Sequence, residues 1–373
     1  MVTPPSRLAP AGERGPTAET AERGTRWPLF RGDPQMRGVA ECALPEKPAL
    51  LWQFAVKNGA FEGTAAIADG VAYIGDMDGE LHALALSDGS KKWEFATDSS
   101  FIASPSVRNG RVYLGDVDGR FVCLDAATGK PLWSFEAQAE IDGCANFLGA
   151  RIVFGSQDAT LYCLEQDSGK LVWKHAIDDQ IRCAPTLIEG HAFVAGCDSR
   201  LHIIDASTGT EKASVDIQSP TGVTPAAEGD RVYFGTEAGT FFAIDWRKAE
   251  VVWTFSASDQ SQAFRSSPAL ANGRVFFGGR DKRLHALDAH SGKELWAHVA
   301  KTRIDASPVV VGDRVFFGSG DGRLTAVDAR DGRVAWEHEV RGGFTGSPAV
   351  AADRLVIASD AGVVYCFGAA DKP

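Results

Sequence analysis

One sequence pattern recurs along the whole chain, and it limits the possible folds more than any other feature. Its glycine position, which alanine fills twice, recurs every 40 residues with one interval of 43: Gly75, Gly115, Gly155, Ala195, Gly235, Gly278, Gly318 and Ala358. Its tryptophan position, which alanine fills once, also has eight members: Trp52, Trp93, Trp133, Trp173, Ala213, Trp253, Trp296 and Trp336. A fixed repeat of this length indicates one supersecondary unit per repeat, stacked against its neighbours.

Each unit contains four short apolar runs separated by turn residues. In one unit the runs are 103–107, 111–114, 120–124 and 131–135. Asp118-Gly119 and Thr128-Gly129 mark the hairpins, because glycine accepts a positive φ and aspartate caps its own turn. Valine and aromatic residues within short runs are typical of strands. Four strands per repeat predict a β-propeller blade, and the 40 glycines of the chain suit such turns better than a helical bundle.

The two ends of the repeat predict how the ring closes. Residues 49–56, with Trp52, match the last strand of a unit, whereas the chain ends after the third strand of its final unit, at 363–367. We therefore expect an all-β, eight-bladed propeller of four-stranded antiparallel blades, closed by the N-terminal strand, which leaves no exposed edge at the seam. The expected organisation is a disordered tail (1–26), a lead-in segment (27–48), the propeller (49–368) and a short tail (369–373).

Charge and cysteine content exclude several classes of function. The formal charge is −11, from 38 basic and 49 acidic residues, so a nucleic-acid partner is not expected. No apolar stretch has the length of a membrane span, and residues 1–26 lack the apolar core of a signal peptide. The seven cysteines contain no CxxC pair. We expect a monomer with reduced thiols, cytoplasmic as the sequence is written, or periplasmic if a leader is missing from the start.

The recurring Ala-x-x-Gly-Lys-x-x-Trp element resembles the tryptophan-docking repeat of the PQQ-like, quinoprotein-type propeller family. Examples are residues 126–133 and 289–296, and the resemblance covers about residues 27–367. The lead-in Trp27-Pro-Leu-Phe-Arg-Gly-Asp-Pro-Gln35 is similar to the segment that precedes such propellers. WD40 repeats are disfavoured, because none of the repeat tryptophans is followed by aspartate.

Two branches of that family imply different functions. Its dehydrogenases hold pyrroloquinoline quinone (PQQ) and calcium. They also carry long insertions and a disulfide between adjacent cysteines, and this sequence has neither the insertions nor an adjacent Cys-Cys pair. Their metal-binding and catalytic residues match no motif here, so no catalytic residue, metal ligand or cofactor is predicted. The BamB-like branch implies a non-catalytic scaffold for a protein or peptide partner. The alternative is a minimal PQQ-dependent oxidoreductase with calcium, so an enzyme is disfavoured but kept open.

One repeat position varies in charge around the ring. It lies three residues before the proline position and should sit at the mouth of the central channel, and we call these residues the channel lip: Glu62, Ile102, Asp142, Arg182, Gly222, Arg265, Asp305 and Thr345. A small anionic or zwitterionic ligand could bind there, and Arg182 and Arg265 would donate hydrogen bonds to it. The other polar residues of this candidate site are Glu62, Asp142, Asp305 and Thr345. Alternatively the charges form a ring of ion pairs, such as Arg265 with Asp305, that only solvates the channel.

The unit that has Ala213 in the tryptophan position is followed by an unusual hairpin. There Trp246, Arg247 and Lys248 replace the common Gly-Lys turn, and they are candidates for binding a partner. The alternative is that Trp246 packs back to replace the missing tryptophan. The longer connection at 258–264 carries either a function or a neutral change in length. His82, His202 and His285 share one strand position, which favours a structural role.

Overall fold

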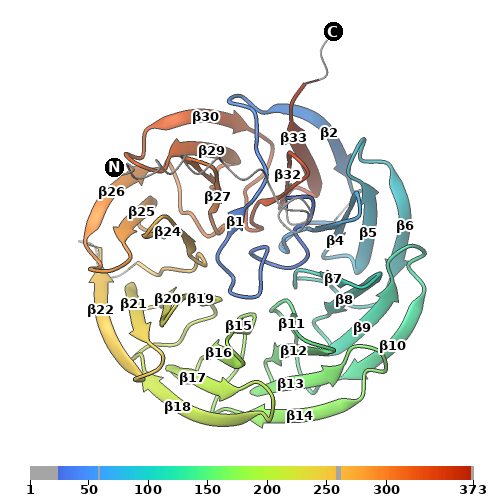
Figure 1. Ribbon diagram of the computed structural model, residues 1–373. Coiled ribbons are helices and arrows are strands. Elements are labelled where there is room, and N and C mark those ends of the chain that lie inside the picture. Colours follow the sequence, from blue (N-terminus) through green and yellow to red (C-terminus); the bar gives the residue numbers. More distant parts are fainter. Residues whose placement is uncertain (1–23, 58, 258–261, 371–373) are drawn as a thin grey trace, which may run out of the picture.

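The computed structural model describes residues 24–57, 59–257 and 262–370, and it confirms the predicted all-β ring (Figure 1). We number the blades along the chain. The first four blades contain these strands: β3 (Ala66–Ala68), β4 (Val71–Gly75), β5 (Glu80–Ala85) and β6 (Lys91–Ala96); β7 (Ser106–Arg108), β8 (Arg111–Gly115), β9 (Arg120–Asp125) and β10 (Pro131–Glu136); β11 (Asn146–Leu148), β12 (Arg151–Ser156), β13 (Thr160–Glu165) and β14 (Leu171–Ala176); β15 (Thr186–Ile188), β16 (His191–Ala195), β17 (Arg200–Asp205) and β18 (Thr210–Asp216).

The remaining four blades follow the same order from the channel to the rim. They contain β19 (Ala226–Glu228), β20 (Arg231–Gly235), β21 (Thr240–Asp245) and β22 (Glu250–Ser256); β23 (Ala269–Ala271), β24 (Arg274–Gly278), β25 (Arg283–Asp288) and β26 (Glu294–Val299); β27 (Val309–Val311), β28 (Arg314–Gly318), β29 (Arg323–Asp328) and β30 (Val334–Glu339); β31 (Ala349–Ala351), β32 (Arg354–Ser359), β33 (Val363–Gly368) and β2 (Ala49–Ala55). Within the described ranges, the structure contains no helix of the length and apolarity that a transmembrane segment requires.

The predicted closure of the ring is confirmed. In the eighth blade the outermost strand is β2, which pairs antiparallel with β33, and Trp52 faces Cys366. The final sheet therefore combines the beginning and the end of the repeat region. In each outer pair of strands the register shifts at the residue before the tryptophan position, as at Leu132 before Trp133. Such bulges disrupt the outer edge of a blade and disfavour pairing with another chain.

A docked indole joins most neighbouring blades. The Trp133 ring of β10 lies against Gly169 in the next blade, so close that a Cβ on Gly169 would be 2.5 Å from the ring. Trp133 Nε1 also donates to the carbonyl oxygen of Gln166 at 3.0 Å. Gly169 has φ of 68°, a conformation that side chains rarely adopt. The same carbonyl hydrogen bond recurs for Trp52, Trp93, Trp173, Trp253 and Trp296.

The blade boundary with Ala213 is filled by Trp246 from the opposite side. Trp246 is only 5% exposed and packs 5.6 Å from Phe193 of the preceding blade, measured between ring centroids. Its Nε1 donates to the carbonyl oxygen of Gly229 at 2.9 Å. The expectation of an exposed Trp246 is therefore wrong, and the packing alternative holds because the cavity left by Ala213 accepts a large ring. Arg247 and Lys248 are exposed, and Arg247 stacks over Trp246.

The lead-in segment crosses the central opening of the ring (Figure 1). Inner strands donate backbone N–H groups to its carbonyl oxygens, as from Ile67 to Trp27, Leu187 to Pro34 and Val310 to Gly38 at 2.8–2.9 Å. In the third blade the Asn146 side chain donates to Pro34 instead, at 2.8 Å. Within the lead-in, β1 (Val39–Ala40) adds a parallel strand to β27. The lead-in therefore satisfies inner edges that would otherwise face an open channel.

Replacing Trp133 by alanine should lower the free energy of unfolding by about 3–5 kcal/mol, because it leaves a cavity between two blades and removes the indole hydrogen bond to the Gln166 carbonyl, which still accepts from Arg111. Chemical denaturation monitored by circular dichroism measures the effect. The exposed neighbour on the same strand provides a control, since Ser134→Ala should change stability by less than about 0.5 kcal/mol. Equal stability of the Trp133 variant and the wild type would contradict the docking role.

Candidate functional site: the channel mouth

The structure brings the eight channel-lip residues together around one cavity. Each blade contributes its lip residue to a cavity of about 290 Å³ at one mouth of the channel: Glu62, Ile102, Asp142, Arg182, Gly222, Arg265, Asp305 and Thr345. They meet because each precedes the innermost strand of its blade, and the eight innermost strands surround the axis. The lip carboxylates come from the first, third and seventh blades, and its guanidinium groups come from the fourth and sixth.

Two of the lip charges, on Arg265 and Asp305, are paired with residues of a second ring. Arg280 donates from Nε and Nη2 to the two oxygens of Asp305, both at 3.0 Å. Arg265 pairs with Glu237 of the preceding blade at 2.9 Å, and Asp305 pairs with Arg280, so the expected Arg265–Asp305 pair is wrong. Arg280 and Glu237 lie two residues after the glycine position of the repeat, together with Gln157. The variable residue type at that position was the signal that could have identified them.

Asp142 is a lip carboxylate whose hydrogen bond comes from a neutral amide. Its Oδ2 accepts from Gln157 Nε2 at 2.8 Å, whereas its buried Oδ1 has no partner among the described residues. Burial raises the pKa of Asp142; the hydrogen bond from Gln157 opposes this shift, and the nearby charge of Glu140 reinforces it. The folded protein therefore resists ionisation of this carboxyl group.

Arg182 is the lip cation that faces a neutral group. Its Nε and Nη2 donate to the amide oxygen of Gln180 at 3.0 and 2.7 Å. The guanidinium is exposed and lines the cavity, so its remaining donors face the mouth of the channel. A guanidinium in this position can bind a carboxylate or phosphate oxygen.

Below the lip, hydroxyl groups form most of a hydrogen-bonded ring. The hydroxyl of each residue accepts from the backbone N–H of the equivalent residue in the preceding blade, at 2.8–3.1 Å: Ser104, Thr224, Ser267, Ser307, Ser347 and Thr64. These positions explain why serine or threonine precedes proline in the repeat. Cys144 and Ala184 fill the other two positions and interrupt the ring. Each hydroxyl keeps its O–H and one lone pair, so it can donate to or accept from a ligand in the cavity.

The lead-in forms the floor of the cavity. Phe30 lines it from below, and the neighbouring Arg31 is buried in the channel at 1% exposure. Arg31 Nη2 donates to the carbonyl oxygens of Pro268, at 3.2 Å, and of Pro308. Burial lowers the pKa of Arg31 to about 9, and the charge of Asp33 opposes the shift. Lead-in and blades therefore close the channel beneath the lip.

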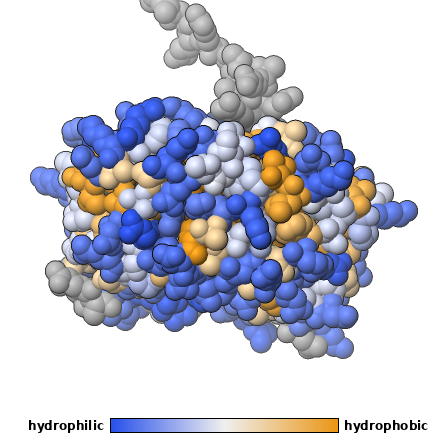
Figure 2. Space-filling view, turned by 90° about the horizontal axis from the view of Figure 1, so that it is seen from below, coloured by the Kyte–Doolittle hydropathy of each residue, from blue (hydrophilic) through white to orange (hydrophobic). Residues whose placement is uncertain are grey.

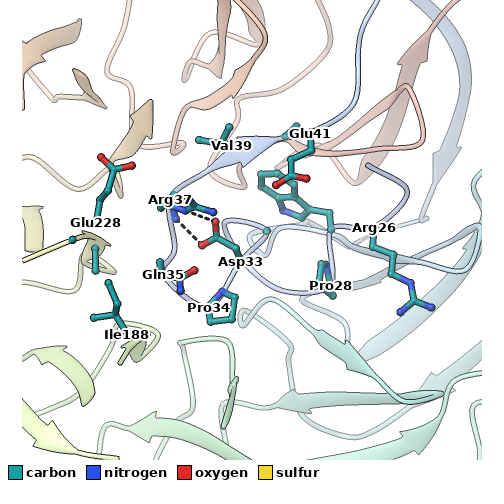
Figure 3. A pocket seen from close by; sticks show the side chains of 15 residues that line it. Arg26, Pro28, Asp33, Pro34, Gln35, Arg37, Val39, Glu41, Ile188 and Glu228 are labelled. Atoms are coloured by element: carbon teal, nitrogen blue, oxygen red, sulfur yellow. Dashed lines mark hydrogen bonds and ion pairs between the residues drawn. The ribbon is translucent and has the colours of Figure 1, made fainter. Parts of the chain in front are cut away.

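A second cavity, of about 700 Å³, lies at the other end of the channel (Figure 3). Inner strands run from the lip to this end, since Gly222 and Thr224 line the first cavity and Glu228 and Gly229 line the second. Its centre is the lead-in itself, where Arg37 Nε donates to Asp33 at 2.7 Å. The lead-in separates the two cavities, so a ligand at the lip would enter from the lip side.

The lip residues do not fit a calcium-supported quinone. Calcium takes about 6–8 oxygen ligands, but Asp305 is held by Arg280 and by Arg303, which lies 2.9 Å away. Among the described residues, the two groups with metal-ligand geometry lie elsewhere in the ring. All seven cysteines are free thiols, and no two are adjacent in the sequence. We therefore derive no step of catalysis through such a cofactor.

Comparisons with known proteins agree with the architecture. A family model described as outer membrane protein assembly factor BamB matches residues 42–149, 141–212 and 157–372. BamB from Moraxella catarrhalis superposes with a TM-score of 0.74 at 17% identity, over 86% of this chain and 100% of that chain. Quinohemoprotein alcohol dehydrogenase from Comamonas testosteroni superposes with a TM-score of 0.79 at 15% identity, over 95% and 82%. At these identities the likeness shows the fold alone.

Curated relatives match shorter segments. The serine/threonine-protein kinase AfsK of Streptomyces griseus is 33% identical over 117 residues, which are 28% of this chain and 14% of the kinase. The quinoprotein alcohol dehydrogenase PedH of Pseudomonas putida is 30% identical over 129 residues, 30% of this chain and 22% of that enzyme. The matched part is therefore a small fraction of each relative. The repeat is shared by proteins whose names describe different activities.

Replacing Asp142 by asparagine should stabilise the protein at pH 7. The raised pKa means that ionisation costs stability above the folded pKa, and this cost disappears below the ordinary pKa of about 3.9. We expect a melting temperature about 1–3 °C higher at pH 7 and a smaller difference towards pH 4, by differential scanning calorimetry. Asp305→Asn is the matched control and should be destabilising, since it leaves Arg280 and Arg303 unpaired. A less stable Asp142 variant at pH 7 would contradict this prediction.

Proposed function

The chain belongs to the PQQ-like propeller family whose model is described as outer membrane protein assembly factor BamB, and on this premise we propose that it is a non-catalytic scaffold that binds a protein or peptide partner. The proposal rests on the rim of the ring and on the composition of the lip. The fold itself is shared with dehydrogenases, so it does not distinguish the two functions.

Exposed aliphatic side chains on the outermost strands are the observation that carries the proposal. Four consecutive blades present them just before or near the tryptophan position, and we call this group the long apolar arc: Val251 and Val252 on β22, Leu295 and Val299 on β26, Val334 on β30 and Leu50 on β2. A short arc follows on β10 and β14, with Leu132, Leu171 and Val172. Figure 2 looks onto the rim and shows apolar patches set among hydrophilic surface.

Charged residues separate the two arcs. At the same two positions of the repeat, β6 has Lys91 and Lys92, and β18 has Glu211 and Lys212. The fold therefore accepts charge at these positions, and stability does not require aliphatic residues there. Apolar residues that stability does not require, gathered over neighbouring blades, are typical of a docking surface. Because bulges disrupt the strand edges, we infer that the partner binds through side chains.

A lysine pair in the long arc tests the proposal. Val251→Lys with Val252→Lys reproduces the residues of β6, so the ring should fold, and it should abolish capture of the partner from the native organism after cross-linking. Leu171→Lys with Val172→Lys is the matched control in the short arc and should retain capture. Mass spectrometry of the captured proteins gives the comparison. Identical sets of captured proteins from all three forms would overturn the assignment of the long arc.

A quinone-dependent oxidoreductase is the second candidate, since PedH and the Comamonas testosteroni enzyme are named as quinoprotein and quinohemoprotein alcohol dehydrogenases. Paired lip charges and the lack of a calcium-like ligand set at the lip weigh against it. We expect titration with PQQ and Ca²⁺ to give no turnover of alcohols or sugars with an artificial electron acceptor. Calcium-dependent binding of PQQ together with turnover would replace the scaffold proposal.

A small anionic ligand at the lip is a subsidiary part of the proposal. Arg182 supports it, because its guanidinium donates to a neutral amide and faces the cavity. The hydroxyls below the lip can add donors beside it. The ion pairs of Arg265 and Arg280 support the alternative of a self-neutralised lip for the other half of the ring.

A further inference from the structure

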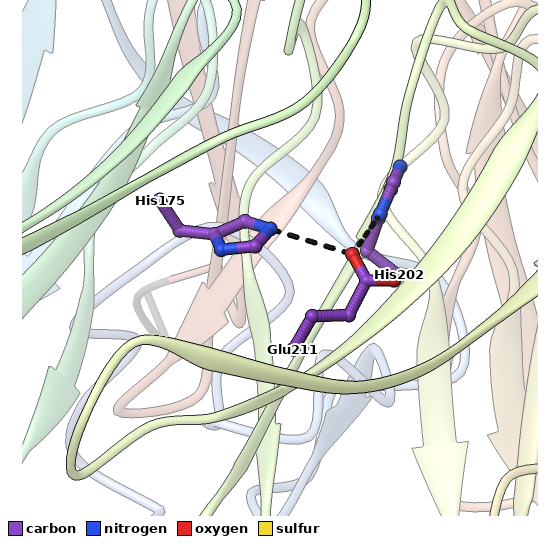
Figure 4. A group of neighbouring side chains, drawn as sticks. All are labelled: His175, His202 and Glu211. Atoms are coloured by element: carbon purple, nitrogen blue, oxygen red, sulfur yellow. Dashed lines mark hydrogen bonds and ion pairs between the residues drawn. The ribbon is translucent and has the colours of Figure 1, made fainter.

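Two histidines and a glutamate meet at the boundary between the third and fourth blades (Figure 4). His175 lies on β14 of the third blade, and His202 and Glu211 lie on β17 and β18 of the fourth. One ligand atom of each residue lies within 4.8 Å of the other two. Glu211 Oε2 is 2.8 Å from His202 Nδ1 and 3.4 Å from His175 Nε2. Imidazole nitrogen and carboxylate oxygen are the ligand atoms that zinc and its neighbours in the first transition row prefer.

A carboxylate on the far side orients the inner imidazole. His202 Nε2 is 2.8 Å from Asp198 Oδ2, and both side chains are buried, at 6% and 4% exposure. When Nε2 donates its proton to Asp198, the lone pair of Nδ1 faces Glu211 Oε2, which is itself an acceptor. A proton or a cation must therefore lie between these two atoms. The arrangement of carboxylate, imidazole and open lone pair is the one that supports metal-binding histidines in proteins.

The boundary between the fifth and sixth blades has an equivalent cluster that lacks the second histidine. There His285 lies between Asp281 and Glu294 at 2.9 and 2.8 Å, almost the distances around His202. The position equivalent to His175 holds Phe255, whose ring lies 5.4 Å from that of His285. The carboxylate–imidazole–carboxylate triad is thus a recurring structural unit that a proton alone satisfies. The boundary between the third and fourth blades differs from it by a second imidazole, that of His175.

Other blades supply one part of the cluster without the rest. In the first blade His82 pairs with Asp76 at 2.8 Å, but Lys91 stands at the position of Glu211 and Phe54 at the position of His175. Lys91 and His82 line the same cavity, so the ammonium disfavours a second cation there. His298 and His338 are equivalent to His175, but Thr325 and Tyr365 stand where His202 would be. Among the described residues, the boundary between the third and fourth blades is the one that has a histidine at both of these repeat positions.

We propose that His175, His202 and Glu211 bind one divalent transition-metal ion, with zinc as the representative ion and Asp198 as the residue that positions His202. The separation of 3.4 Å between His175 and Glu211 equals the edge of a tetrahedron with bonds of about 2.1 Å. The His202–Glu211 separation of 2.8 Å must open by about half an ångström to reach the same edge. His175 and Glu211 are 18% and 33% exposed, so the fourth position faces solvent and water can fill it.

Such an ion would join two blades across a boundary. Two ligands come from one blade and one from the other, so binding requires the ring to be assembled. Metal binding to the folded state alone stabilises that state by mass action. Zinc should therefore raise the melting temperature of the wild type, and this gives a measurement independent of stoichiometry.

The site is tested by exchanging the residues at positions 175 and 255, which are equivalent in the repeat: His175→Phe and Phe255→His. The probes are Zn²⁺ in equilibrium dialysis and Co²⁺ in visible spectroscopy, on the full chain without a histidine tag. We expect one ion per wild-type chain, at least a tenfold loss of affinity in His175→Phe, and a second site in Phe255→His. His175→Phe introduces the residue that the fifth blade already carries at this position, beside His285 of the sixth blade, so the fold should accept it. Tetrahedral Co²⁺ absorption should disappear in His175→Phe and increase in Phe255→His.

Two outcomes would overturn the proposal. The first is zinc binding of unchanged affinity in both His175→Phe and Glu211→Gln, which would place the ion elsewhere. The second is the absence of saturable zinc binding by the folded wild type, measured together with an unchanged melting temperature. Should His175→Phe fail to fold, the stoichiometry of Phe255→His against the wild type decides the matter, because that variant keeps every proposed ligand.

Discussion

The indole that lies against a positive-φ glycine of the next blade is the contact on which the ring depends. Each blade has its own hydrogen-bonded sheet, but adjacent blades are held by side chains, and the docked tryptophan supplies both a large apolar area and a directed hydrogen bond. Glycine is required there because a Cβ would overlap the indole and because φ is positive. Trp246 shows how strong the requirement is: where Ala213 removes the docking ring, a tryptophan from the neighbouring hairpin fills the same boundary from the other side.

The lead-in imposes a second constraint, this time on the channel. Its carbonyl oxygens accept from inner strands around the ring, and Trp27, Leu29 and Met36 are buried with it. With its channel closed, the propeller presents one cavity at each end of the channel and a rim around the outside. In the lip cavity Arg265 and Asp305 are paired, whereas the rim carries exposed aliphatic side chains. This distribution is the basis of the proposed binding of a macromolecular partner at the rim.

Sequence periodicity predicted the blades, the closing strand and the gathering of the lip residues, because all three follow from residues that keep the same place in every repeat. It could not predict contacts that depend on which blade is next. Arg265 pairs with Glu237 and leaves Asp305 to Arg280, and this choice is made by side-chain reach across one boundary. The path of residues 24–41 was not predicted either, since its hydrogen bonds use backbone atoms and carry no signature in residue type. The strand position shared by His82, His202 and His285 predicts one structural role for all three. It carries no sign that, among the described residues, His175 contacts His202 alone of the three.

Departures from the repeat therefore carry more functional information than the repeat itself. A residue type that recurs in every blade serves the ring, and its environment can be checked against seven equivalents. A residue type that occurs once must be explained locally, and the equivalents then show what the ring requires at that place. By this comparison Phe255 shows that packing requires an aromatic ring beside a buried imidazole, and His175 meets that requirement while adding a nitrogen donor. Packing alone thus explains why an aromatic ring stands at residue 175. It does not explain why the Nε2 of His175 lies 3.4 Å from Glu211 Oε2, and this short distance is the physical basis for assigning a metal ligand there.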